Sequence, residues 1–181
     1  MIIFVVVIIF LVMIYLLICY NNFVKLNNQV KEAYSTMDIY LKKRWDLVPN
    51  IVEIVKKYDK YEKETLEEIV KLRNGSYENM NDSMKIDIND KIEQGLRKLI
   101  VISENYPELK ANENFSDLSN QLSKIEDDIA NARKYYNGTV RSYNNKVEMF
   151  PSNIFARFFG YRLKTMFEAT VDEHQNVKFE L

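Results

Sequence analysis

Charge is absent from the first 24 residues of this chain, and turn-forming residues are scarce throughout it. Lys25 is the first charged side chain, and residues 2–19 form an unbroken apolar run. As a helix rising 1.5 Å per residue, this run spans roughly 27 Å, close to the ~30 Å hydrocarbon core of a bilayer. Tyr15 and Tyr20 lie where interfacial aromatic residues are found. Residues 1–24 are therefore predicted to be a transmembrane anchor.

The sequence lacks the residues that a cleaved signal peptide or a lipoprotein signal would require. A cleaved signal peptide has a basic start, a shorter apolar core and small residues at the cleavage point, and none of these is present. A lipoprotein site at Cys19 would need a small residue before it, where this chain has Ile18. The sequence therefore favours an uncleaved anchor.

Basic residues are also missing before the apolar run, whereas five follow it within about twenty residues. They are Lys25, Lys31, Lys42, Lys43 and Arg44. This asymmetry predicts a single-pass protein of the cell membrane, with its N-terminus outside and its bulk in the cytoplasm. The lone cysteine can form no internal disulfide, which fits either orientation.

The whole chain has only 4 glycines and 3 prolines, which suits a few long helices joined by short connections. Its 25 basic and 26 acidic side chains nearly cancel, so no strong positive field favours nucleic acid as a partner. We expect an all-α fold, in which the transmembrane helix is followed by an antiparallel up-and-down bundle of three to four long helices.

Apolar residues recur every three or four positions from Phe23 to Val55, including Leu41, Trp45 and Val48. Similar seams run over 92–106 and 115–150. The seam over 115–150 includes Leu122 and Ile129 as predicted core residues, and Asn114 is a candidate N-cap of its helix. Pro49 leaves two arrangements open. A turn near 46–49 gives four segments, at about 20–46, 49–73, 86–106 and 113–149, and this is the arrangement we favour. A helix that continues through Pro49 gives a kinked three-helix coil.

Residue patterns typical of metal binding, nucleophilic catalysis and phosphate binding are largely missing. The single histidine, His174, lies in the polar tail, so the Glu-x-x-His pairs of carboxylate-bridged metal sites are absent. No serine or cysteine has a histidine partner in the predicted bundle, and there is no glycine-rich phosphate loop. We therefore expect no enzyme activity, no cofactor and no small-molecule substrate.

Two polar stripes remain on the predicted helices. Each is either a solvated face laced with ion pairs or a groove that holds a partner. The first polar stripe comprises Asp38, Lys42, Asp46, Asn50 and Glu53, and the second comprises Arg133, Asn137, Arg141 and Asn144.

The segment 154–167 is rich in aromatic and basic residues. It either caps one end of the bundle or lies on an anionic membrane surface. The candidate membrane-surface residues are Phe155, Arg157, Phe158, Phe159, Arg162 and Lys164. A turn at Pro49 would return this segment toward the bilayer, whereas the kinked coil would carry it away.

Several long segments of the sequence resemble the bacterial LemA family. They are YNNFV at 20–24, YSTMDIYLKKRWDLVPNIVE at 34–53, ENYPELKAN at 104–112, ARKYYNGTVRSYN at 132–144 and FPSN at 150–153. The resemblance implies a single-pass membrane protein with an antiparallel helical bundle and no established enzymatic activity. Some members are associated with membrane remodelling around bacterial organelles, and others are encoded near membrane zinc peptidases.

These observations predict three regions: a transmembrane anchor at 1–24, a LemA-like bundle at 25–150, and an aromatic and basic segment with a polar tail at 151–181. We expect a membrane-anchored scaffold or interaction protein that binds a protein partner or itself. The alternative is an adaptor or regulatory subunit of a membrane peptidase or envelope stress system.

Overall fold

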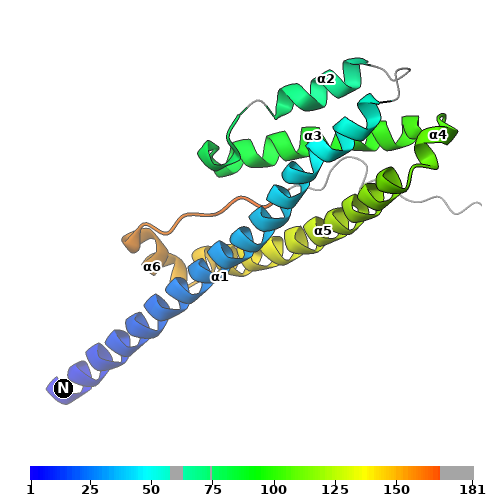
Figure 1. Cartoon of the computed structure of the whole chain (residues 1–181). Coiled ribbons are helices and arrows are strands. Elements are labelled where there is room, and N and C mark those ends of the chain that lie inside the picture. The colour runs from blue at the N-terminus through cyan, green and yellow to red at the C-terminus, as the bar shows by residue number, and fades with distance from the viewer. Residues whose placement is uncertain (58–62, 74, 168–181) are drawn as a thin grey trace, which may run out of the picture. The chain divides into compact units, whose positions relative to one another are not determined.

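The computed structural model describes residues 1–57, 63–73 and 75–167, and over these ranges the chain forms helices and no strand. The all-α prediction is thus confirmed. Figure 1 shows the elements in chain order: α1 (Ile2–Lys56), α2 (Lys63–Leu72), the 3-10 turn η1 (Tyr77–Asn79), α3 (Asp82–Ser103), α4 (Pro107–Lys110), α5 (Glu113–Glu148) and α6 (Ser152–Phe159).

The chain divides into two compact units, which are described separately. The terminal unit comprises the described parts of Met1–Ser35 and Ala132–Leu181, and the central unit comprises those of Thr36–Asn131. The helices α1 and α5 each contribute residues to both units. The predicted region boundaries at residues 24 and 150 stay predictions.

Pro49 lies inside α1, so the turn expected at 46–49 is absent and the helix continues to Lys56. A proline within a helix costs about 3 kcal/mol. The residues around it offset that cost, because Val48, Ile51 and Val55 are buried and each buried aliphatic side chain contributes about 1.5–3 kcal/mol. The prediction of a turn was wrong, and the apolar seam runs through the proline without a break.

In the terminal unit, α1 packs from Cys19 onward against the end of α5 and against α6. The buried cluster consists of Cys19, Phe23, Val30, Val140, Tyr143, Phe155 and Ala156. The Phe23 ring stacks on the rings of Phe155 and Tyr161 at centroid distances of 5.7 and 4.5 Å. Phe23 therefore belongs to a folded core although it lies within four residues of the end of the apolar run.

The central unit buries the seams that the sequence predicted. Trp45, Leu122 and Ile129 are all buried. Gly95 lets α2 approach α3 closely, because a Cβ at this position would lie 2.7 Å from Cγ1 of Ile69. The α5 helix begins at Glu113, and the Asn112 side chain, not that of Asn114, accepts the hydrogen bond from the Phe115 N–H.

Candidate functional site

The first polar stripe begins with residues that hold the 3-10 turn η1 in the central unit. The Asp38 carboxylate accepts hydrogen bonds from the Tyr77 hydroxyl at 2.8 Å and from Lys85 Nζ at 2.9 Å. Burial and the Asp38 carboxylate both raise the pKa of Tyr77, because each disfavours the phenolate. Tyr77 also packs against Trp45, with ring centroids 5.4 Å apart.

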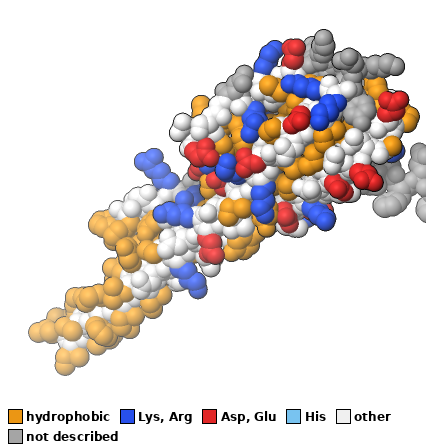
Figure 2. Space-filling view, in the orientation of Figure 1, with side chains coloured by type: hydrophobic (Ala, Val, Ile, Leu, Met, Phe, Trp, Pro, Cys, Tyr) orange, Lys and Arg blue, Asp and Glu red, His pale blue; other side chains and the backbone are white. Residues whose placement is uncertain are grey.

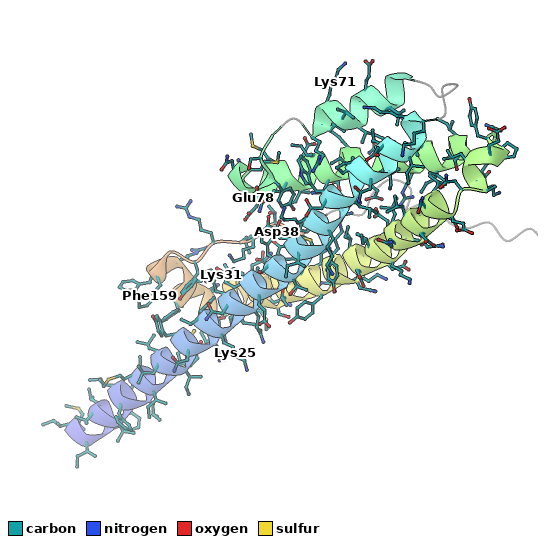
Figure 3. All side chains as sticks on the ribbon, in the orientation of Figure 1. Lys25, Lys31, Asp38, Lys71, Glu78 and Phe159 are labelled. Carbon is teal, nitrogen blue, oxygen red and sulfur yellow. The ribbon has the colours of Figure 1, made fainter. Side chains whose placement is uncertain are left out.

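Lys42, the next residue of this stripe, reaches the same turn. Its Nζ lies 3.2 Å from Glu78 Oε1 and 3.4 Å from Asp46 Oδ2. Hydrogen bonds from the Glu78 backbone N–H, the Ser76 hydroxyl and Lys42 lower the pKa of Glu78 to about 2. Figure 3 labels Asp38 and Glu78 in this region.

The far end of the first polar stripe is exposed. Asn50 and Glu53 line an open groove of about 360 Å³ with Asn114, Asp117 and Gln121 of α5, together with Ile54 and Leu118. Glu53 also pairs with Lys57 at 3.5 Å. The first polar stripe is therefore divided between an internal contact and a solvent-facing groove.

A buried charge cluster, which sequence reasoning missed, lies beside this stripe. The Arg44 side chain is 0% exposed, and its Nη1 lies 3.0 Å from Glu93 Oε2 of α3 and 2.8 Å from Glu126 Oε2 of α5. Its Nε donates to Asn89 Oδ1 at 3.3 Å. Arg97 Nη2 reaches the other Glu93 oxygen at 2.8 Å from a largely exposed position.

Burial raises the pKa of Glu126, with the Glu93 charge adding to this effect and the Arg44 guanidinium opposing it. The cluster therefore joins three helices through one charge that is fully removed from water. A signal for it was present in the sequence: Arg44 lies three residues after Leu41 and four before Val48, on the apolar seam itself.

The second polar stripe lies in the terminal unit and contacts residues 161–167, which follow α6. The Asn137 and Asn144 side chains each form two hydrogen bonds with the backbone of this segment, at Phe167 and Lys164. Arg133 Cζ lies 5.8 Å from the centroid of the Phe167 ring. Arg141 is exposed.

The candidate membrane-surface residues separate into buried and exposed sets. Phe155 is buried in the core of the terminal unit, so it is not part of an exposed surface. Phe158 and Phe159 are exposed, as are Arg157 and Arg162. Lys164 is half-buried with its Nζ 5.3 Å from the Tyr143 ring centroid.

The Phe159 ring meets Tyr20 edge to face at 6.4 Å, so α6 lies beside the end of the apolar run of α1 (Figure 3). The expectation that a continuous α1 would carry this segment away from the membrane end was wrong. The end of α5 itself lies beside this part of α1, because Val140 and Tyr143 pack in one cluster with Cys19 and Phe23, and α6 directly follows α5.

Within the described ranges, no three histidine, cysteine, aspartate or glutamate side chains are grouped so as to hold a metal ion. His174 and the rest of the polar tail lie outside the described residues. In the central unit, Arg44 and Lys85 form ion pairs that join different helices, and this arrangement is typical of a structural cluster.

Among the described helices, α1 alone is long and apolar enough to cross a membrane. The fold is thus that of an all-helical protein with one candidate membrane helix. The model of the LemA family matches residues 33–180, and the chain belongs to that family. It is 25% identical over 158 residues to Protein LemA of Metamycoplasma hominis, a match that covers 87% of this chain and 72% of that protein.

Replacing Arg44 by methionine tests the buried cluster. The Arg44→Met variant retains the side-chain volume but leaves Glu93 and Glu126 close together without their shared cation. We expect its free energy of unfolding to fall by about 3–5 kcal/mol, as is typical when one partner of a buried ion pair is removed. Denaturant unfolding followed by the fluorescence of Trp45 measures this loss.

Arg97→Met is the matched control, because Arg97 contacts the same Glu93 from an exposed position. Its loss should stay below about 1 kcal/mol, as for other exposed ion pairs. Equal losses in the two variants would contradict the special role of Arg44.

Proposed function

We propose that this chain is a single-pass membrane protein whose helical part serves as an interaction scaffold on the cytoplasmic side, without catalytic activity. The observation that carries the proposal is the exposure of an entirely apolar helix. In the most apolar window of α1, only 6% of the residues are buried within the protein. A helix that is apolar on every face and unburied requires a lipid environment.

The surface of α1 supports this assignment. Figure 2 shows hydrophobic side chains gathered over its N-terminal part, with charged side chains beginning beyond it. Lys25 and Lys31 follow the apolar run and are exposed. Basic residues that directly follow a span favour a cytoplasmic position for the bulk of the chain.

The helix α6 is proposed to lie in the interface of the same membrane leaflet. Its buried Phe155 fixes it to the core beside Phe23, and its outer side presents Phe158 at 82% exposed and Ile154 at 62%. Arg157 and Arg162 add positive charge. An apolar face with basic neighbours, held beside the end of a membrane span, is the arrangement that binds an anionic interface.

The full-length chain is expected to stay in the membrane pellet after carbonate extraction. Its bulk should resist protease added outside intact spheroplasts and should be digested once they are permeabilised. Ile8→Asp/Leu11→Lys should release the chain into the soluble fraction, since charges at the centre of a span cost about 2.5–3.5 kcal/mol each. The conservative Ile8→Leu/Leu11→Ile variant should behave as wild type.

Uncleaved wild-type protein in the carbonate supernatant would contradict the anchor, and digestion in intact spheroplasts would reverse the orientation. The alternative function, as an adaptor of a membrane peptidase, would be favoured if a peptidase co-purified in stoichiometric amounts from a detergent extract.

A tryptophan probe tests the position of α6. In a Trp45→Phe background, Phe158→Trp in full-length protein reconstituted into anionic vesicles should emit at short wavelength and be quenched by lipids brominated near the headgroup. The natural Trp45 is only 4% exposed and serves as the control that such lipids should not quench. If the indole introduced by Phe158→Trp emitted as it does in water and were unaffected by brominated lipids, an interfacial α6 would be contradicted.

A further inference from the structure

The segment Tyr161–Phe167, called the strap here, follows α6 and returns along α5 (Figure 1). Every third residue of the strap is half-buried: Tyr161, Lys164 and Phe167. The residues between them are exposed. Burial of every third residue is typical of an extended segment that has three residues per turn. One side of the strap therefore faces the neighbouring helix.

Two asparagine side chains of α5 hold that side. Asn144 accepts a hydrogen bond from the Lys164 N–H at 2.9 Å and donates one to the Lys164 carbonyl at 2.8 Å. Asn137 accepts from the Phe167 N–H at 2.9 Å and donates to the Phe167 carbonyl at 3.0 Å. Each amide thus supplies the donor and the acceptor that a neighbouring strand would supply in a sheet.

The spacing of the two asparagines matches the spacing of the residues they hold. Seven residues of α-helix rise about 10.5 Å, and three residues of extended chain rise roughly 9–10 Å. The earlier asparagine holds the later strap residue, so the strap runs antiparallel to α5. The helix therefore offers a fixed register for an extended backbone, whichever chain supplies it.

Side chains at the two held positions add selectivity. Phe167 packs edge to face on Tyr136 at 5.1 Å and lies against Arg133. Lys164 Nζ lies 5.3 Å from the centre of the Tyr143 ring. The site thus suits an extended segment with a basic residue three positions before an aromatic one. In peptide recognition generally, main-chain hydrogen bonds supply affinity and side-chain contacts supply specificity.

We propose that this face of α5 is a peptide-recognition site, which the strap occupies within its own chain and which the strap of a second copy occupies between chains. Gly160, with φ of 74°, ends α6 and turns the chain into the strap. The strap of a second copy carries the same basic and aromatic residues at the same spacing, so no new surface is needed. The proposal rests on the proposed membrane anchor, because anchored copies present strap and α5 at the same depth.

Two full-length variants each remove one side of the contact. Asn137→Ala/Asn144→Ala removes both side-chain amides that bind the strap backbone and leaves the strap intact. Lys164→Pro/Phe167→Pro removes both N–H donors, since proline has none, and leaves α5 intact. Donor- and acceptor-labelled copies of the full chain are reconstituted together in vesicles, and energy transfer between them is measured.

Wild-type copies should show energy transfer above that of randomly distributed anchors, and each variant mixed only with itself should lose at least three quarters of the excess. Mixing the two variants should restore about half of the wild-type excess, because one of the two reciprocal contacts is then complete. Thr165→Pro, which keeps the N–H groups of Lys164 and Phe167, should retain most of the signal.

Absence of excess energy transfer in the wild type, or excess transfer that both variants keep, would overturn exchange between copies. Failure to restore transfer in the mixed pair would do the same. Carbonate extraction of every sample separates this outcome from failure of the anchor, since wild-type protein that leaves the membrane would refute the proposed function instead. Far-ultraviolet circular dichroism checks that the variants remain helical.

Discussion

The guanidinium of Arg44 is a full charge removed from water, and the central unit is arranged around it. Such a charge is tolerated only where partners replace its hydration, and here Asn89 and Glu93 of α3 and Glu126 of α5 do so at Nε and Nη1. Sliding α3 or α5 along α1 would break the contacts that the displaced helix makes with this charge. We therefore interpret the cluster as the contact that fixes the register of α1, α3 and α5 in this unit.

The two polar stripes have a common role within the chain, since each holds a segment that is not α-helical. Asp38 and Lys42 hold the 3-10 turn through Tyr77 and Glu78. Asn137 and Asn144 hold the strap through its backbone. A protein with few glycines and prolines forms few tight turns of its own, so its connecting segments are ordered by side chains that project from long helices.

The sequence predicted the features that depend on composition and on helical period. The apolar run and the seams with Leu122 and Ile129 needed no tertiary information. The continuity of α1 through Pro49 did need it, because only the burial around the proline decides between a turn and a helix.

The chemistry of the polar residues was predicted less well. A search for apolar periodicity considers only apolar residues, and so it missed Arg44, which is charged although it lies on the apolar seam. The partners of Arg44 lie 45 or more residues away in the sequence. The second polar stripe was predicted as a face that solvates the helix or holds a partner. Its contact with residues 161–167 was not anticipated. Seven residues of helix and three residues of extended chain have similar lengths, but this match can be recognised only when the positions of both segments are known.

The state of the Arg44 side chain tests this account most directly. In nitrogen-15 NMR spectra of the labelled full-length protein in micelles, the account predicts a resolved Arg44 Nε–H signal whose hydrogen exchanges with water far more slowly than those of exposed arginines such as Arg97. It also predicts slow rotation about the guanidinium bonds, since Nη1 is held by two carboxylates. Exchange of the Arg44 hydrogens as fast as those of Arg97 would contradict a core built around a buried charge.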